Sequence, residues 1–224
     1  MFQISDTWKT TYPVAKLGVL VMRNVINPPH HAGLDSKKTT LENELRARFS
    51  GQDKAALTQH PVLQAYEAYY KSFKKTYHVQ LQLESILFKA KSIPSVAALV
   101  EAMFMAEVDH LLLTAGHDLD TLQLPLTLDV TPGEEIYTLL RGVEQATKAG
   151  DMLIRDGEGI ISSILYGPDA RTQINPRTRN VIFTVYAPTG IDKPAIEQHL
   201  QAIQGDVLLI APRSQTEMLQ VFDS

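Results

Sequence analysis

The sequence has no cysteine among its 224 residues, which excludes disulfide bonds, thiolate metal ligands and cysteine nucleophiles. It also has no apolar run near the length of about 18 residues that a membrane-spanning helix needs. The first residues lack the basic and then apolar segments of a secretory signal. These absences predict a cytoplasmic protein that has no membrane partner.

Several catalytic motifs are also missing. Neither G-x-G-x-x-G nor G-x-x-x-x-G-K-[ST] occurs, so no loop is predicted to cradle phosphates. Without G-x-S-x-G, Ser162 and Ser163 do not lie on a nucleophile elbow. His30 and His31 are adjacent, but H-E-x-x-H is absent and no convincing third ligand lies near them. We therefore expect neither a metal ion nor another cofactor.

The net charge of −4 is distributed unevenly along the chain. Residues 35–91 carry ten Lys/Arg against six Asp/Glu, whereas residues 92–224 carry eight against eighteen. A general nucleic-acid binder is basic overall, so we expect at most a local basic face. The candidate RNA-binding residues, from a helix end and a later loop, are Lys71, Lys74, Lys75, Arg177 and Arg179. The alternative for the three lysines is a solvated helix end, where cations favour the dipole.

The first half of the chain is predicted to be mostly helical. Strands at residues 2–4 and 16–26 come first, and the second is apolar enough to be buried on both faces. A capping-box pattern at Thr39 and Glu42 predicts the start of a helix that Gly51 ends. Three further helices are predicted, with Pro61 in the first turn of one, residues 79–89 in the next and Pro94 at the start of the last.

The second half is predicted to be mostly strands. The expected strands are 124–130, 135–140, a hairpin of 152–154 and 160–165 joined at Asp156-Gly157, then 180–187 and 207–211. Asp192 is expected to cap a helix that ends at Gly205, and residues 216–222 to form a terminal helix. A helical segment at about 35–110 and a mainly β core at about 111–211 predict one α+β domain over residues 1–224.

Two polar segments are candidates for a functional site. Residues 166–178 form a polar loop between two predicted buried strands. Catalytic and binding residues often lie on such loops. Residues 114–120 follow a short apolar run and are equally polar. The alternative is that the Gly, Pro, Asn and Asp residues in both segments only form turns.

Three features in these and neighbouring segments follow one another in a fixed order. They are Asp118-Leu119-Asp120, then Val130 to Glu134 with Gly150 to Asp156, then Tyr166 to Thr172 with Thr178-Arg179-Asn180-Val181. Together they resemble the B3/B4 domain of the phenylalanyl-tRNA synthetase β subunit. The chain resembles the free-standing B3/B4 proteins of many bacteria more closely than it resembles the synthetase domain. The resemblance covers residues 94–187, and its order and spacing are more specific than any single motif.

The resemblance implies a mixed β/β/α sandwich. It also implies a role with tRNA, because the synthetase domain hydrolyses tyrosine wrongly attached to the phenylalanine tRNA. There the pocket is lined by residues just before the D-L-D element and by the loop that corresponds to residues 165–172. Substrate-binding candidates in this chain are Thr114, Asp118, Ser163 and Tyr166.

This sequence departs from the synthetase pattern at two positions. The family's editing histidine stands three residues before the first Asp of D-L-D, where this chain has Ala115, and the nearby imidazole is His117. The family's pocket glutamate aligns near Ala170, next to Asp169. The free-standing proteins share an Asp-x-Arg-Thr-like element, which Asp169, Arg171 and Thr172 match.

The catalytic candidates are therefore His117, Asp169, Arg171 and Thr172. Arg171 would pair with a phosphate or carboxylate, Asp169 would receive an ammonium group, and His117 would be the general base. Thr172, with Thr114 and Tyr166, would donate to a carbonyl or orient water. The alternatives are that Arg171 and Asp169 only pair with each other across the loop, that Thr172 bonds a turn and that His117 is a core histidine.

Two functional hypotheses follow, together with a weaker one of a purely structural subunit. One is a hydrolase that edits aminoacyl-tRNA in trans, which the dense polar loop favours. The other is a non-catalytic module that binds RNA or a small amino-acid-like ligand, which Ala115 and Ala170 favour. Both predict that residues 114–120 and 166–172 line one pocket, with Arg171 pointing into it.

Overall fold

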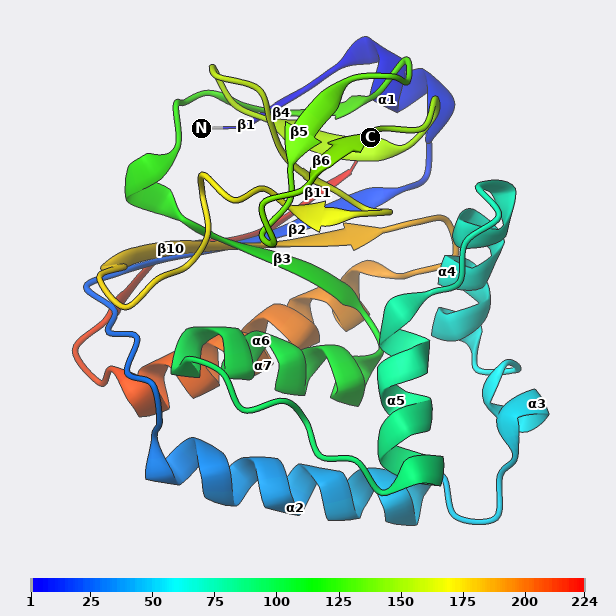
Figure 1. The fold of residues 1–224 in the computed structure, drawn as a ribbon, viewed down its shortest axis with the longest axis vertical. Helices are drawn as coiled ribbons and strands as arrows, with labels where there is room; N and C mark the ends of the chain where they lie inside the picture. The colour runs from blue at the N-terminus through cyan, green and yellow to red at the C-terminus, as the bar shows by residue number, and fades with distance from the viewer. Residues whose placement is uncertain (1, 224) are drawn as a thin grey trace.

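The computed structural model describes residues 2–223, and two β-sheets that face each other form its centre (Figure 1). The five-stranded sheet has the order β1 (Phe2–Ile4), β4 (Leu126–Val130), β7 (Met152–Arg155), β8 (Ile160–Ser163) and β9 (Gly167–Pro168). The four-stranded sheet has the order β11 (Gln215–Asp223), β2 (Lys16–Arg23), β10 (Asn180–Ala187) and β3 (Leu113–Asp118). A separate hairpin pairs β5 (Ile136–Thr138) with β6 (Glu144–Ala146).

Helices cover the outer face of the four-stranded sheet (Figure 1). The long helices are α2 (Ala32–Arg48), α4 (Pro61–Ser72), α5 (His78–Lys89), α6 (Ala98–His110) and α7 (Lys193–Ile210), and the short ones are α1 (Asp6–Thr11), α3 (Lys54–Leu57) and the 3-10 turn η1 (Leu119–Thr121). α6 and α7 lie on the sheet, α2 lies outside them, and α4 and α5 stand at one end (Figure 1). The α+β class and the β/β/α layers predicted from the sequence are confirmed. No helix within residues 2–223 has the length and apolar character needed to cross a membrane.

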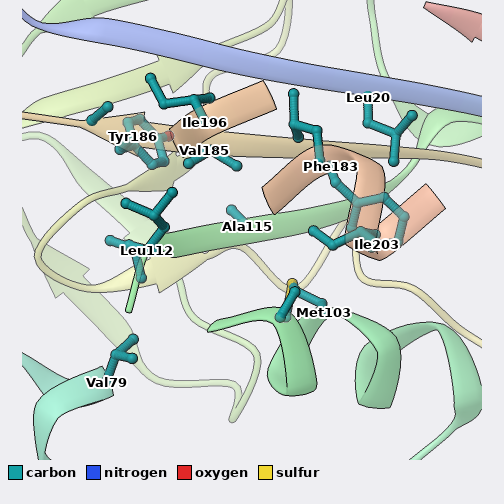
Figure 2. Packing of buried hydrophobic residues seen from close by; sticks show 14 of the residues in the cluster. Leu20, Val79, Met103, Leu112, Ala115, Phe183, Val185, Tyr186, Ile196 and Ile203 are labelled. Carbon is teal, nitrogen blue, oxygen red and sulfur yellow. The ribbon is translucent and has the colours of Figure 1, made fainter. Parts of the chain in front are cut away.

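The central strands are apolar because both of their faces are covered. The interior of β2 is buried from Leu17 to Met22, and β10 is buried from Val181 to Ala187. Figure 2 shows Ile196 and Ile203 of α7 beside Val185 and Phe183 of β10. On the opposite face of the same strand, the Tyr186 hydroxyl reaches Ser162 of the five-stranded sheet. The sequence of a strand packed between two layers is a continuous apolar run, because both faces are buried, and does not alternate between apolar and polar residues.

Tyrosines on one helix join the helical layer to both sheets. Tyr66 of α4 donates to the carbonyl oxygen of Tyr186 and accepts from the Leu113 N–H, at the end of the four-stranded sheet. Tyr69 donates to Asp151, immediately before β7, and Tyr70 donates to the Ile164 carbonyl, immediately after β8 of the five-stranded sheet. The spacing of three and four residues places all three rings on one face of the helix.

Several predicted boundaries are correct and others are wrong. The strands at residues 2–4 and 180–187 and the helix that begins at Pro61 occur as predicted. The capping box at Thr39 is wrong, because α2 begins at Ala32 and the Thr39 hydroxyl bonds the Asp35 carbonyl inside the helix. The hairpin at Asp156 exists, but its loop is four residues long and the Asp156 N–H donates to the Gly159 carbonyl.

The predictions after residue 205 are wrong. α7 passes through Gly205 and continues to Ile210, so residues 207–211 are mostly helix rather than a strand. Residues 216–222 form strand and not helix, because β11 pairs with β2 along its whole length. A short apolar run is compatible with either structure, and pairing with β2 decides the outcome here.

Two glycines in these elements should respond oppositely to alanine. A Cβ on Gly18 of β2 would lie 2.4 Å from Cγ2 of Ile196, whereas a Cβ on Gly205 of α7 would meet nothing within 4 Å. Gly18→Ala should lower the free energy of unfolding by about 1–3 kcal/mol through overpacking. Gly205→Ala should raise it by roughly 0.5–1 kcal/mol, because alanine loses less backbone entropy in a helix. Urea unfolding measures both, and equal effects would contradict the packing described here.

Candidate functional site

A cavity of about 490 Å³ lies beside β3, the edge strand of the four-stranded sheet. Residues 113–116 of β3 line it, together with residues 165–168, which comprise β9 and the two residues before it. Only part of each segment predicted to share a pocket lines this cavity: residues 114–116 and 166–168 do, whereas residues 117–120 and 169–172 are not in its lining. α5 and α6 close another side, and Figure 2 shows Met103 rising from α6 toward β3.

Most of this lining is apolar. Val100, Met103 and Phe104 of α6 line the cavity together with Leu165 and Ile174. The residues with polar side chains that line the cavity are His78, Gln82, Glu107, Thr114, Ser163, Tyr166, Gln173 and Tyr186. A largely apolar wall with a few polar groups is the usual composition of a small-molecule site.

The free edge of β3 brings backbone donors to the cavity. The Thr114 N–H donates to Oε1 of Glu107 at 2.9 Å, and the Asp118 N–H donates to the Thr172 carbonyl at 2.8 Å. Alternate N–H groups of a strand point to the same side. The N–H of Gly116, which lies between them and lines the cavity, therefore faces the same edge.

Glu107 is the most unusual residue of the cavity, and the sequence reasoning missed it. Its side chain comes from the apolar helix α6 and is 2% exposed. Burial raises its pKa to about 8, although the hydrogen bond from the Thr114 N–H opposes the shift. Only Oε1 has a hydrogen-bond partner among the described residues. An acidic residue within a long apolar run is the sequence signal that would have identified it.

His117 does not reach the cavity, so its predicted role as general base is not supported. It is fully buried on the opposite face of β3 from Gly116 and is not among the lining residues. The Thr172 hydroxyl donates to Asp169 and therefore accepts from Nδ1 of His117, at 2.7 Å. Burial lowers the pKa of His117 to about 3. It is a neutral core histidine, which was the alternative reading of the sequence.

Arg171 does not point into the cavity, and that prediction is wrong. Its guanidinium binds both carboxylate oxygens of Asp156, at 2.8 and 3.0 Å, and also lies 3.6 Å from Asp169. Burial opposes ionisation of Asp156, but the hydrogen bonds from Arg171 and from the N–H groups of Gln123 and Glu158 together outweigh burial, so the pKa of Asp156 is lowered. Arg171, Asp169, Thr172 and His117 do lie together, but as a cluster that joins the loop to the β7–β8 turn.

The two motif segments that begin at Asp118 and Thr178 are hydrogen-bonded to each other. Oδ2 of Asp118 accepts from the Thr178 hydroxyl at 2.7 Å and from the Asn175 side chain at 3.2 Å. Asp120 accepts from the Asn180 side chain at 2.8 and 2.9 Å. The carboxylate of Asp118 is thus occupied by loop contacts, and it is absent from the cavity lining.

The other predicted substrate-binding residues do line the cavity. Thr114 lines it, but its hydroxyl bonds Nε2 of His199 at 2.7 Å, behind the wall. The Ser163 hydroxyl accepts from the Tyr166 N–H at 3.2 Å. Tyr166 is partly exposed, and the Lys75 ammonium lies 4.9 Å from its ring centroid.

The predicted RNA-binding residues form two separate groups. Lys71 is paired with Glu67, and Lys74 and Lys75 follow the end of α4. Arg177 and Arg179 precede β10, whereas α4 contacts the far end of that strand through Tyr66. An eight-residue strand is roughly 25 Å long, so the arginines lie at the opposite end of β10 from the Tyr66 contact.

Removing Arg171 should destabilise the fold, because it leaves the buried Asp156 carboxylate without its charge partner. Arg171→Ala should lower the free energy of unfolding by about 1–3 kcal/mol. The control Arg213→Ala, at an exposed loop residue, should stay within about 0.5 kcal/mol of the wild type. Urea unfolding measures both. Unchanged stability of Arg171→Ala would contradict the structural role of this pair.

Among known proteins, the chain is similar to a solved structure, whereas no curated protein matches it. An N-terminal fragment of the phenylalanyl-tRNA synthetase β-subunit from Pyrococcus horikoshii matches with a TM-score of 0.49 and 10% sequence identity. The match covers 100% of this chain and 54% of that one, so the chain spans about half the length of the fragment.

A family model gives the assignment directly. Residues 63–203 match the model of the B3/4 domain, and this stretch holds the cavity walls on α5, α6, β3 and the β8–β9 turn. The match extends over more than half of the sequence. The chain belongs to the B3/4 domain family.

Proposed function

We propose that the cavity beside β3 binds the aminoacyl group at the 3′ end of an aminoacyl-tRNA. The observation that carries this proposal is the buried carboxyl of Glu107, with one unpartnered oxygen, in a largely apolar cavity of about 490 Å³. Membership of the B3/4 domain family adds the expectation of tRNA. Fold alone does not fix a function, so the site has to support the ligand independently.

The cavity suits an amino-acid-sized ligand in volume and in chemistry. Small-molecule sites commonly occupy about 300–1,000 Å³ and present few polar groups. The side chain of an aminoacyl group would pack against Met103 and Phe104 of α6. Its ammonium group would pair with Glu107, whose carboxyl has a pKa of about 8 and would release its proton on binding, since a carboxylate–ammonium hydrogen bond is stronger than a neutral one.

Hydrolysis of the ester is a second candidate, favoured by the N–H of Gly116 at the same wall. Ester hydrolysis needs donors that stabilise an oxyanion and a group that holds or releases a proton. Gly116 supplies a backbone donor, and Glu107, with a pKa of about 8, is able to exchange a proton near neutral pH. His117 would take no part. Binding without turnover is the alternative that the replacement of the family histidine by Ala115 favours.

Glu107→Gln should weaken aminoacyl binding about tenfold, because the amide cannot carry the negative charge that pairs with an ammonium group. The measurement is the affinity for a hydrolysis-resistant aminoacyl-tRNA carrying an amide linkage. Glu197→Gln, at a partly exposed position of α7, is the matched control and should leave the affinity unchanged. No binding by the wild-type protein, across a panel of amino acids at low salt, would refute the proposal.

Turnover is tested separately with ester-linked mischarged tRNAs. Phenylalanine tRNA that carries tyrosine, and a panel of other mischarged tRNAs, are incubated with the pure protein and a chelator. Release of the amino acid faster than the uncatalysed rate, reduced in Glu107→Gln, supports the hydrolase. If the amino acid is released at the uncatalysed rate while the protein still binds the tRNA, the protein is a non-catalytic binding module.

The raised pKa of Glu107 also predicts a pH-dependent stability difference. Between an unfolded pKa near 4.5 and a folded pKa of about 8, the folded protein retains a proton that the unfolded chain releases. The free energy of unfolding therefore falls with rising pH in this window, by roughly 1.4 kcal/mol per unit of pKa difference. Glu107→Gln removes this loss, so its stability relative to the wild type should increase from pH 5 to pH 8. Urea unfolding at both values measures it, and a difference independent of pH would contradict the shift.

A further inference from the structure

We propose that a ledge at the mouth of the cavity, formed by Lys75, Arg141, Gln145 and Tyr166, binds the phosphate and base of a nucleotide. The inference rests on the proposed function, because the nucleotide would be the one that carries the aminoacyl group. It defines the ligand class more closely. The protein would take an aminoacyl ester of a phosphorylated nucleotide or RNA end, and a free amino acid would be a poor ligand.

The ledge is continuous with the aminoacyl cavity. A second hollow of about 360 Å³ contains all four ledge residues. It shares Leu140, Leu165, Tyr166 and Pro168 with the first cavity. A ligand whose aminoacyl group lies against α6 would therefore extend directly across Tyr166 onto the ledge.

Two cations of the ledge have no carboxylate partner. Among residues 2–223, neither Lys75 nor Arg141 forms an ion pair, and both are exposed. Lys71, one turn earlier on the same helix end, is instead neutralised by Glu67 at 2.9 Å. Residues 92–224 carry eighteen acidic groups and only eight basic ones. The lack of an acidic partner for Arg141 is therefore not explained by an excess of basic residues in this part of the chain. Unpaired cations beside a ligand cavity favour an anionic group such as phosphate.

Ordered turns hold both cations in place. Lys75 follows Lys74, which has a φ of 56°, and its N–H donates to the Tyr70 carbonyl at 3.0 Å. Arg141 lies in the β5–β6 turn, where the Leu139 N–H donates to the Val143 carbonyl at 2.9 Å. The two side chains therefore project from fixed backbone, which reduces the entropy lost when they order on a ligand.

Tyr166 supplies a surface for the base. Its ring is partly exposed, and at present the Lys75 ammonium covers it at 4.9 Å from the centroid. An exposed cation–π contact is weaker than the stacking of a nucleobase on an aromatic ring. A base would therefore displace the ammonium group, which then becomes available to the phosphate. Gln145, partly buried at the same hollow, would bond the base edge.

The test compares three probes: an aminoacylated 3′-terminal RNA trinucleotide with an amide linkage, the same aminoacyl adenosine without phosphates, and the unacylated trinucleotide. Lys75→Ala and Arg141→Ala should each weaken the acylated trinucleotide about three- to tenfold and reduce its salt slope by about one. Both should change the phosphate-free probe less than twofold. Lys71→Ala and Arg213→Ala are the matched controls and should bind every probe like the wild type.

The outcomes separate this inference from the proposed function. The ledge proposal would be refuted if Lys75→Ala and Arg141→Ala affected both acylated probes equally, or affected neither. The proposal for the aminoacyl cavity would be unaffected by that result. Salt-sensitive binding of the unacylated trinucleotide that needs Lys75 and Arg141, together with no effect of Glu107→Gln on any probe, would support the ledge and remove the aminoacyl proposal. Absence of binding by all three probes would overturn both.

Discussion

The hydrogen bonds of three tyrosine hydroxyls on α4 are the contacts on which the site most depends. Tyr66, Tyr69 and Tyr70 reach the ends of strands in both sheets, and burial raises the pKa of each phenol, so all three stay neutral donors. Buried polar groups must be paired, so displacing α4 would leave carbonyl and carboxylate groups of both sheets without partners. The strands that it holds, at Leu113 and Ile164, lead directly into two parts of the cavity lining.

The cavity lies at the outer side of β3, where no strand within residues 2–223 pairs with β3. An open strand edge presents unpaired backbone groups, which proteins usually cover. Here Glu107 and the Thr172 carbonyl take two of the N–H groups, and the space between them is left to a ligand. The polar residues of the neighbouring loop mostly bond one another, so the loop supplies the shape of the site. The apolar helix α6 supplies its one buried acid.

The parts of the fold that depend on local pattern could be predicted from the sequence. The apolar run at residues 180–187 and the proline at the start of α4 gave correct elements, because burial and backbone geometry act locally there. Contacts between distant segments could not be predicted. Arg171, which follows β9, binds Asp156 in the β7–β8 turn, and Asp118 binds Thr178, sixty residues later in the chain. The polar residues that suggested a catalytic site therefore join loops instead. Glu107 escaped notice because only folding brings the Thr114 N–H to it.

The pairing of β2 with β11 has a consequence for the order of folding during synthesis. β2, at residues 16–23, lies between β10 and β11, whose residues 180–187 and 215–223 are made some 160 to 200 residues later. A ribosome adds about 5–20 residues each second, so β2 waits for many seconds without either neighbour. The helices between residues 32 and 110 are complete long before the sheet that they cover. Nascent chains would therefore expose an apolar strand for most of translation, a state in which holdase chaperones commonly bind.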